Sequence, residues 1–137
     1  MSVLAPNVRN LIACEKIESD VANPSRTTLI NLIGNLFSMD EPSFPASFEE
    51  MAIYVQLTEC RGSGKVGVDI IHDETGEVIY NKKMWDVQFA NQPLRVLGLI
   101  FRLHSIRFPA KGFYWIRFWF NDQAIDERLI TLRGRHE

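Results

Sequence analysis

Few residues of this chain have the type and spacing that chemistry requires, and the first candidates are His72, Asp73 and Glu74. An imidazole beside two carboxylates could ligate a metal ion or exchange protons with a substrate. No second histidine stands two or four residues from His72, so one element does not carry a pair of metal ligands. The three residues adjoin a glycine-containing turn, where acidic side chains commonly hydrogen-bond the loop amides. We therefore predict no metal site and no cofactor.

The thiols of Cys14 and Cys60 are the next candidates. The chain has no Cys-x-x-Cys pair, which a zinc ribbon would need. A nucleophilic thiol needs a histidine and an orienting group close in space, and sequence distance does not place them. The first ten residues lack a basic region followed by an apolar stretch, so we expect no secretory signal and a reducing, cytoplasmic location. We interpret both residues as small buried hydrophobes.

Motifs of phosphate-binding proteins and hydrolases are also missing. Residues 62–65 (GSGK) lack the first glycine of a phosphate-binding loop, and no helix is predicted to follow them. Adjacent carboxylates at 49–50 and 126–127 would point to opposite faces of a strand and would not converge on one substrate. The sequence therefore favours a protein that is not an enzyme, and an enzyme with an unrecognised site is the least favoured alternative.

The elements that would position any site are predicted to be strands. Valine and isoleucine together number 22 against 8 alanines, a bias that favours sheet. Apolar and polar residues alternate with period two in 51–60, 65–72 and 85–89, and glycine-containing breaks separate these segments. We predict about eight strands and no helix beyond a single turn near 45–50. The predicted strands are residues 9–17, 27–37, 51–60, 65–72, 77–89, 95–107, 112–120 and 124–132.

Short antiparallel strands at this spacing predict an all-β fold in which two sheets pack as a sandwich, with a small β-barrel as the alternative. We expect the 137 residues to form one domain, because the irregular connections at 18–26 and 39–47 have neither the length nor the bias of a linker. No run of eighteen apolar residues is present, so a membrane span is not predicted.

Four short segments carry a resemblance to a known family. They are residues 11–15 (LIACE), 32–37 (LIGNLF), 44–46 (FPA) and 112–114 (GFY). In this order and spacing, the chain resembles a family of small single-domain bacterial proteins of unknown function with an immunoglobulin-like β-sandwich fold. The resemblance implies that fold and no activity, cofactor or catalytic residue. In such sandwiches a tyrosine at this place turns its hydroxyl back to the preceding corner, so we predict a structural role for Tyr114.

The most informative segment is the predicted strand 112–120, in which residues 113–120 read FYWIRFWF. If the even-numbered residues from Tyr114 to Phe120 face the core, the odd-numbered set is too apolar for a solvated face. The hairpin with 124–132 then predicts Arg117 opposite Asp126 and Trp115 opposite Arg128. Glu127 would point toward the core in this register, so we expect a bulge or a shifted register there.

Charge is distributed unevenly along the chain. Residues 1–90 carry seven basic and thirteen acidic side chains, whereas residues 91–137 carry eight basic and four acidic. We expect the neighbouring strand 95–107 to add Arg102 and His104 to the aromatic surface. Such a surface would suit an interface, because arginine and aromatic residues are enriched at protein interfaces. The predicted interaction face consists of Phe113, Trp115, Arg117, Trp119, Arg128, Ile130, Arg102 and His104.

Protein interaction or homodimerisation is the function that this face favours, because a contiguous exposed apolar patch is unusual on a monomer. The alternative is a ligand-binding module that stacks nucleic-acid bases or sugars on tryptophan and phenylalanine. A net charge of -2 does not favour nucleic acid as the partner, and no small molecule is identified. A purely structural interpretation is also open, in which residues 18–26 or 39–47 fold over the aromatic strand and cover it.

Overall fold

The computed structural model describes residues 5–20, 22, 26–89 and 93–134. The all-β prediction is confirmed, and within these residues there is no helix. The single helical turn expected near 45–50 is wrong, because a strand begins at Ala46. The strands are β1 (Asn7–Ser19), β2 (Thr27–Leu32), β3 (Asn35–Phe37), β4 (Ala46–Thr58), β5 (Ser63–His72), β6 (Val78–Tyr80), β7 (Trp85–Gln88), β8 (Leu97–Phe108), β9 (Gly112–Phe120) and β10 (Gln123–Arg133).

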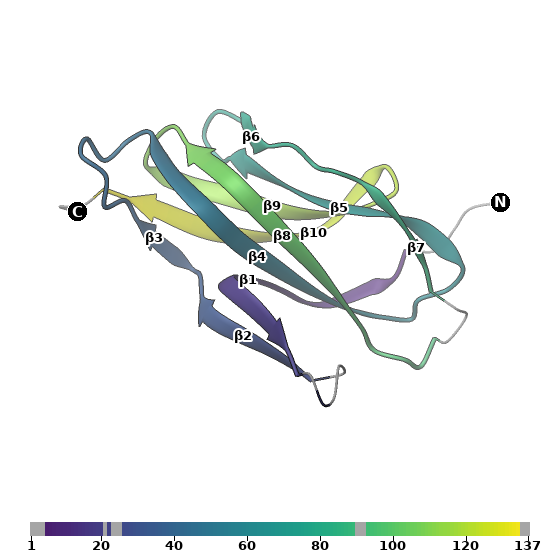
Figure 1. Cartoon of the computed structure of the whole chain (residues 1–137). Helices are drawn as coiled ribbons and strands as arrows, with labels where there is room; N and C mark the ends of the chain where they lie inside the picture. The colour runs from purple at the N-terminus through teal and green to yellow at the C-terminus, as the bar shows by residue number, and fades with distance from the viewer. Residues whose placement is uncertain (1–4, 21, 23–25, 90–92, 135–137) are drawn as a thin grey trace.

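These strands form two sheets that pack face to face, as Figure 1 shows. The first sheet has the order β2-β1-β4-β8, and the second has the order β3-β10-β9-β5-β6, with β7 also pairing β5. Neighbouring strands are antiparallel except β3, which runs parallel to β10. The prediction of a two-sheet sandwich is therefore confirmed, and the barrel alternative is wrong because the sheets do not close on each other.

Two of the predicted strands are broken by chain crossings. The segment 27–37 divides into β2, which stays with β1, and β3, which joins the other sheet. The segment 77–89 divides into β6 and β7, because residues 81–84 pass over the outer face of β5 at Gly67. A Cβ atom on Gly67 would lie 2.5 Å from the sulfur of Met84 and 3.2 Å from the carbonyl oxygen of Lys83, so a larger residue would require this segment to shift.

The core between the sheets is built from alternating side chains of both. Ile53 and Val55 of β4 face Val68 and Ile70 of β5 across this core, and all four are buried. From β9 the core receives Tyr114, Ile116, Phe118 and Phe120. The prediction for this face of β9 is therefore confirmed, as strict alternation in a two-sheet sandwich requires.

Both cysteines are buried as free thiols, so the structure supports the structural interpretation. Cys60 belongs to the main core, whereas Cys14 packs with Ile17 and Ala52 in a small second cluster. Burial raises the pKa of each thiol above 9.0, because the apolar surroundings disfavour the thiolate.

We expect neither thiol to react with an aromatic disulfide reagent in the native protein at about pH 8, because the thiolate is the attacking species. Both should react after unfolding in guanidinium chloride, as measured by absorbance of the released aromatic thiol. Because the native pKa is raised, ionisation of the thiols does not change the free energy of unfolding below pH 9.0. The free energy of unfolding should fall as pH rises above that value. Rapid labelling of the native protein would contradict this burial.

Candidate functional site

The candidate surface is the outer face of the six-stranded sheet, the side that points away from the core. Strand β9 presents Phe113, Trp115, Arg117 and Trp119 on this face, as the sequence predicts. Phe113 is 50% exposed, and the other three side chains are half-buried. Strands β10 and β5 flank β9, so their outward residues decide what these four side chains contact.

A bulge changes the residues that β10 contributes to this face. The register shifts between Ala124 and Asp126, which confirms the expected irregularity. Beyond it, Arg117 pairs with Glu127 and Trp115 pairs with Leu129, so the predicted pairings with Asp126 and Arg128 are wrong. One extra residue places every following side chain of β10 on the face opposite to the one predicted. Glu127 is therefore exposed to solvent.

The eight residues predicted to form one face do not lie together. Ile130 pairs with Tyr114 and is fully buried, and Arg128 pairs with the inward-facing Ile116, so the prediction is wrong for both. It is also wrong for Arg102 and His104, because β8 pairs with β4 in the other sheet and not with β9.

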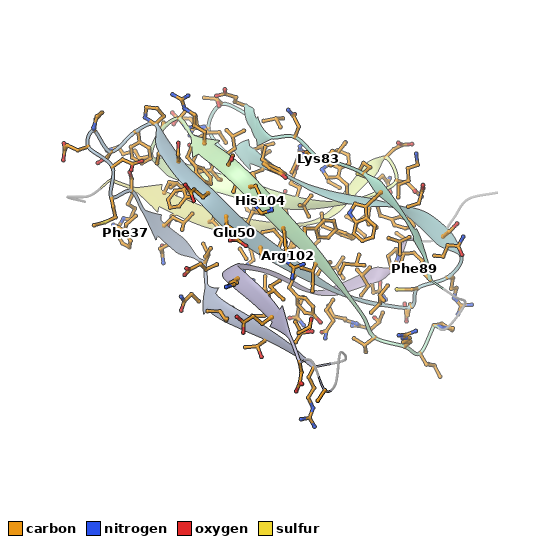
Figure 2. All side chains as sticks on the ribbon, in the orientation of Figure 1. Phe37, Glu50, Lys83, Phe89, Arg102 and His104 are labelled. Carbon is orange, nitrogen blue, oxygen red and sulfur yellow. The ribbon has the colours of Figure 1, made fainter. Side chains whose placement is uncertain are left out.

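Arg102 and His104 are exposed on the four-stranded sheet. Figure 2 shows them along β8 close to Glu50, whose backbone pairs with His104. Their position follows from the corner at 109–111, which carries the chain from the first sheet to the second.

An ion pair lies at the centre of the outer face. The Arg117 Nε donates to Oδ1 of Asp69 at 2.9 Å, and Nη2 donates to Oδ2 at 2.6 Å. Asp69 is only 3% exposed, and its hydrogen bonds raise the pKa of the Arg117 guanidinium. Sequence reasoning missed Asp69, although a carboxylate between Val68 and Ile70 of β5 was a usable signal.

Trp119 is covered by the segment 81–84. The Nζ atom of Lys82 lies 3.3 Å from the centre of the indole ring, and the Cζ atom of Arg117 lies 5.0 Å from it. The interpretation that chain covers the aromatic strand is thus right for Trp119, but neither predicted segment is the one that covers it. The ring face of Trp119 that Lys82 occupies is therefore not available for a base or sugar to stack on.

The exposed part of the outer face is a small apolar surface at one end of the sheet, which we call the end patch. It consists of Phe37, Phe113 and Leu129, which are 47%, 50% and 38% exposed. The register places all three on the outward side of neighbouring strands, because Phe37 lies opposite Arg133 of β10, Phe113 lies opposite Thr131, and Leu129 precedes Thr131 by two residues. Figure 2 shows Phe37 at this end of the molecule.

A groove of about 600 Å³ adjoins the end patch. Phe113 and Thr131 line it together with the charged residues Glu74, Lys111 and Arg133. The Cζ atom of Arg133 also lies 5.9 Å from the ring centre of Phe37, which links the two sides of the surface. Sequence reasoning missed Phe37, because its place depends on the parallel pairing of a three-residue strand with β10.

His72 forms a hydrogen bond with the turn that follows β5. Its Nδ1 atom accepts a hydrogen bond from the backbone N–H of Thr75 at 3.2 Å, and the residue is buried. Asp73 accepts a hydrogen bond from the indole N–H of Trp115 at 2.7 Å, so the histidine and this carboxylate have separate partners. Across the residues that the structure describes, no three His, Cys, Asp or Glu side chains are placed to hold a metal ion. His136 lies outside that part of the chain.

The fold and this surface define a class: an all-β protein of two packed sheets, with one sheet face partly exposed. The chain belongs to a family of unknown function, DUF6941, whose model matches residues 17–133. The predicted resemblance to a family of unknown function is thereby confirmed. None of the described residues forms a helix of the length and apolar character that crossing a membrane requires.

No curated protein matches the chain. Among solved structures it is similar to a β-glucosidase from Listeria innocua in complex with isofagomine, at 10% identity and a TM-score of 0.47. A second structure of a β-glucosidase from Listeria innocua matches at 11% identity and a TM-score of 0.45. Each match covers 94% of this chain and 16% of the β-glucosidase chain, so the enzyme's activity is not carried over.

Proposed function

We propose that this protein is a non-enzymatic interaction module that self-associates through the end patch. The observation that carries the proposal is the exposure of Phe37, Phe113 and Leu129 on neighbouring strands of one sheet face. Burying large apolar side chains against a second surface is favourable by roughly 25 cal/mol for each Å² removed from water. Isolated exposed apolar residues need no explanation, whereas a group of three at one place does.

The charges around the end patch support a second copy as the partner. Glu74 and Arg133 both line the groove beside Phe113, so the surface has an apolar centre with both signs of charge at its rim. A two-fold axis brings the same surface patch of each copy together and allows the acidic side of one to meet the basic side of the other. Strand β3 at this edge of the sheet is only three residues long. A second copy is therefore expected to pack against the sheet face and not to pair with the edge strand.

The immunoglobulin-like class is also part of this proposal. Its support is the hydroxyl of Tyr114, which donates to the carbonyl oxygen of Ala110 at 2.6 Å at the corner before β9. Further support comes from the strand order, with β9 between β5 and β10 in one sheet and β4 between β1 and β8 in the other. A single domain, a bacterial origin and a cytoplasmic location stay predictions.

We expect the protein to have a mass near twice 15.8 kDa by light scattering at micromolar concentration, and Phe113→Glu to return it to the monomer. In a dimer the introduced carboxylate would be buried without a partner, and this opposes association. In the monomer position 113 is exposed, so the substitution is tolerated there. Val78→Glu is the matched control, because Val78 is also exposed but lies on β6 at the opposite edge of the sheet. A monomer at every concentration tested would refute self-association.

A further inference from the structure

The last part of β1 and strand β2 form a two-stranded unit at one edge of the first sheet, and we call residues 15–19 and 27–32 the outer hairpin. Strand β1 pairs with β4 only as far as Cys14, which lies opposite Ala52. Its pairing with β2 continues beyond that point to Ser19. Strand pairing therefore joins the outer hairpin to the rest of the sheet at one end only.

The outer hairpin covers a small apolar area on the outer face of the first sheet. Ile53 and Val55 of β4 face the core, so Ala52 and Tyr54 face outward. Ile17 of the hairpin packs there with Cys14 and Ala52, and these three form the second buried cluster of the described residues. No residue of β2 is fully buried. Segments with few buried apolar contacts open more readily than the core does.

Arg102 joins the outer hairpin to the far strand of the same sheet. It lies on β8 opposite Ala52 of β4. Its Nη2 atom donates to the carbonyl oxygen of Ile17 at 3.4 Å, so the side chain reaches across β4 to the hairpin backbone. The guanidinium is charged, and hydrogen bonds from charged donors are stronger than those between neutral groups.

The two strands of the outer hairpin are anchored at the same level. The backbone N–H of Ile33 donates to the carbonyl oxygen of Ala13 at 2.8 Å. Just inside this anchor, Nδ2 of Asn31 donates to Oε2 of Glu15 at 2.7 Å. Asn31 has a φ of 56°, a left-handed conformation that asparagine tolerates in turns and irregular positions. Glu15 and Asn31 therefore mark a line about which the hairpin can pivot.

A cleft of about 430 Å³ lies at the other end of the outer hairpin. Ser19 and Thr27 line it from the hairpin, and Tyr54, Gln56 and Ile100 line it from the sheet. The outer hairpin thus packs on the sheet near its anchor and is separated from the sheet at its far end.

We propose that the outer hairpin is a lid that opens as one unit about Glu15 and Asn31, with Arg102 as its latch. Opening breaks the hydrogen bond to Ile17 and keeps the pairing between β1 and β2. It uncovers the outward apolar surface of β4 and the thiol of Cys14. The lid lies on the other sheet from the strands of the end patch, so it goes beyond the proposed self-association.

The two cysteines provide a reporter and a reference for this motion. The Sγ atom of Cys14 donates to the carbonyl oxygen of Lys16 at 3.4 Å, so part of the hairpin itself covers this thiol. Cys60 belongs to the main core, away from the second cluster. Opening of the lid exposes Cys14 alone, whereas global unfolding exposes both thiols.

The test is slow labelling of the full chain with iodoacetamide at about pH 8, over hours and without denaturant, because the thiolate is the reacting species. Peptide mass spectrometry follows each cysteine, and each rate is divided by the rate of the same thiol in guanidinium chloride. We expect Cys14 to be labelled about tenfold faster than Cys60 on this scale, because local opening is more frequent than global unfolding. Equal normalised rates would overturn the lid.

Arg102→Met should raise the rate at Cys14 about tenfold and leave the rate at Cys60 unchanged, because the closed lid loses a hydrogen bond from a charged donor. Arg107→Met is the matched control, since it removes an exposed arginine from the same strand, and it should change neither rate. The same Cys14 rate in both variants would overturn the latch, as would an equal rise at both cysteines in Arg102→Met. Phe113→Glu should leave the Cys14 rate unchanged, so failure here and failure of self-association are distinguishable.

Discussion

Arg117→Met should lower the free energy of unfolding by about 3–5 kcal/mol, the largest loss that we expect from one substitution on the outer sheet face. The variant leaves the carboxylate of Asp69 in a place where only 5% of its side chain is exposed, without the two hydrogen bonds at 2.6 and 2.9 Å. A charge removed from water and left without its partner is strongly destabilising. Guanidinium unfolding followed by circular dichroism measures the loss.

Two controls define this prediction. The double variant Asp69→Leu/Arg117→Met should recover most of the loss, because apolar residues of similar volume often replace a buried ion pair at little cost. Arg128→Met removes an exposed arginine from the neighbouring strand and should change stability by less than about 0.5 kcal/mol. A loss below about 1 kcal/mol for Arg117→Met would mean that the pair behaves as a surface salt bridge.

Tyr114→Phe should cost about 1–3 kcal/mol although it removes a single oxygen atom. The hydroxyl donates to the carbonyl of Ala110 at 2.6 Å and accepts the N–H of the same residue at 3.3 Å. The phenyl ring keeps its edge contacts with Phe108 and His72, so the variant isolates the hydrogen bonds at the corner. Thermal and chemical unfolding compared with Tyr54→Phe, a half-buried tyrosine of β4, provide the measurement.

The stability contributed by Tyr114 should also depend on pH in a defined direction. Burial raises the pKa of its hydroxyl above 10.0, because the phenolate is disfavoured away from water. The contribution is therefore fully present below pH 10.0 and is lost as pH rises through the higher native value. The stability difference between the native protein and Tyr114→Phe should shrink above that pH. A difference that stays constant or grows would contradict the assignment.

The outer face of the six-stranded sheet thus has two parts with different roles. Its centre is occupied by internal contacts, since Arg117 is bound to Asp69 and Trp119 is covered by Lys82. Substitutions at this centre are expected to change the stability of the fold more than the binding of any partner. Its end retains exposed Phe113 and Leu129, so substitutions there should change association and leave the fold intact.

Local alternation in the sequence determined most of the strands and both faces of β9. The period of two in 113–120 places Tyr114 and Phe118 in the core and Trp115 and Arg117 outside it, and the structure agrees. The corner hydroxyl of Tyr114 was also predictable, because a glycine two residues earlier and a strand start are both local features. These properties depend on neighbouring residues along the chain and on the geometry of a single strand.

Only the tertiary structure decided which strands are neighbours and in what register. The place of β8 in the other sheet separates Arg102 from the aromatic face, and one bulged residue in β10 sends Ile130 into the core. The segment that covers Trp119 and the strand that brings Phe37 beside β10 arise in the same way. Strand order and register follow from pairing between distant segments, which the period of each strand does not encode.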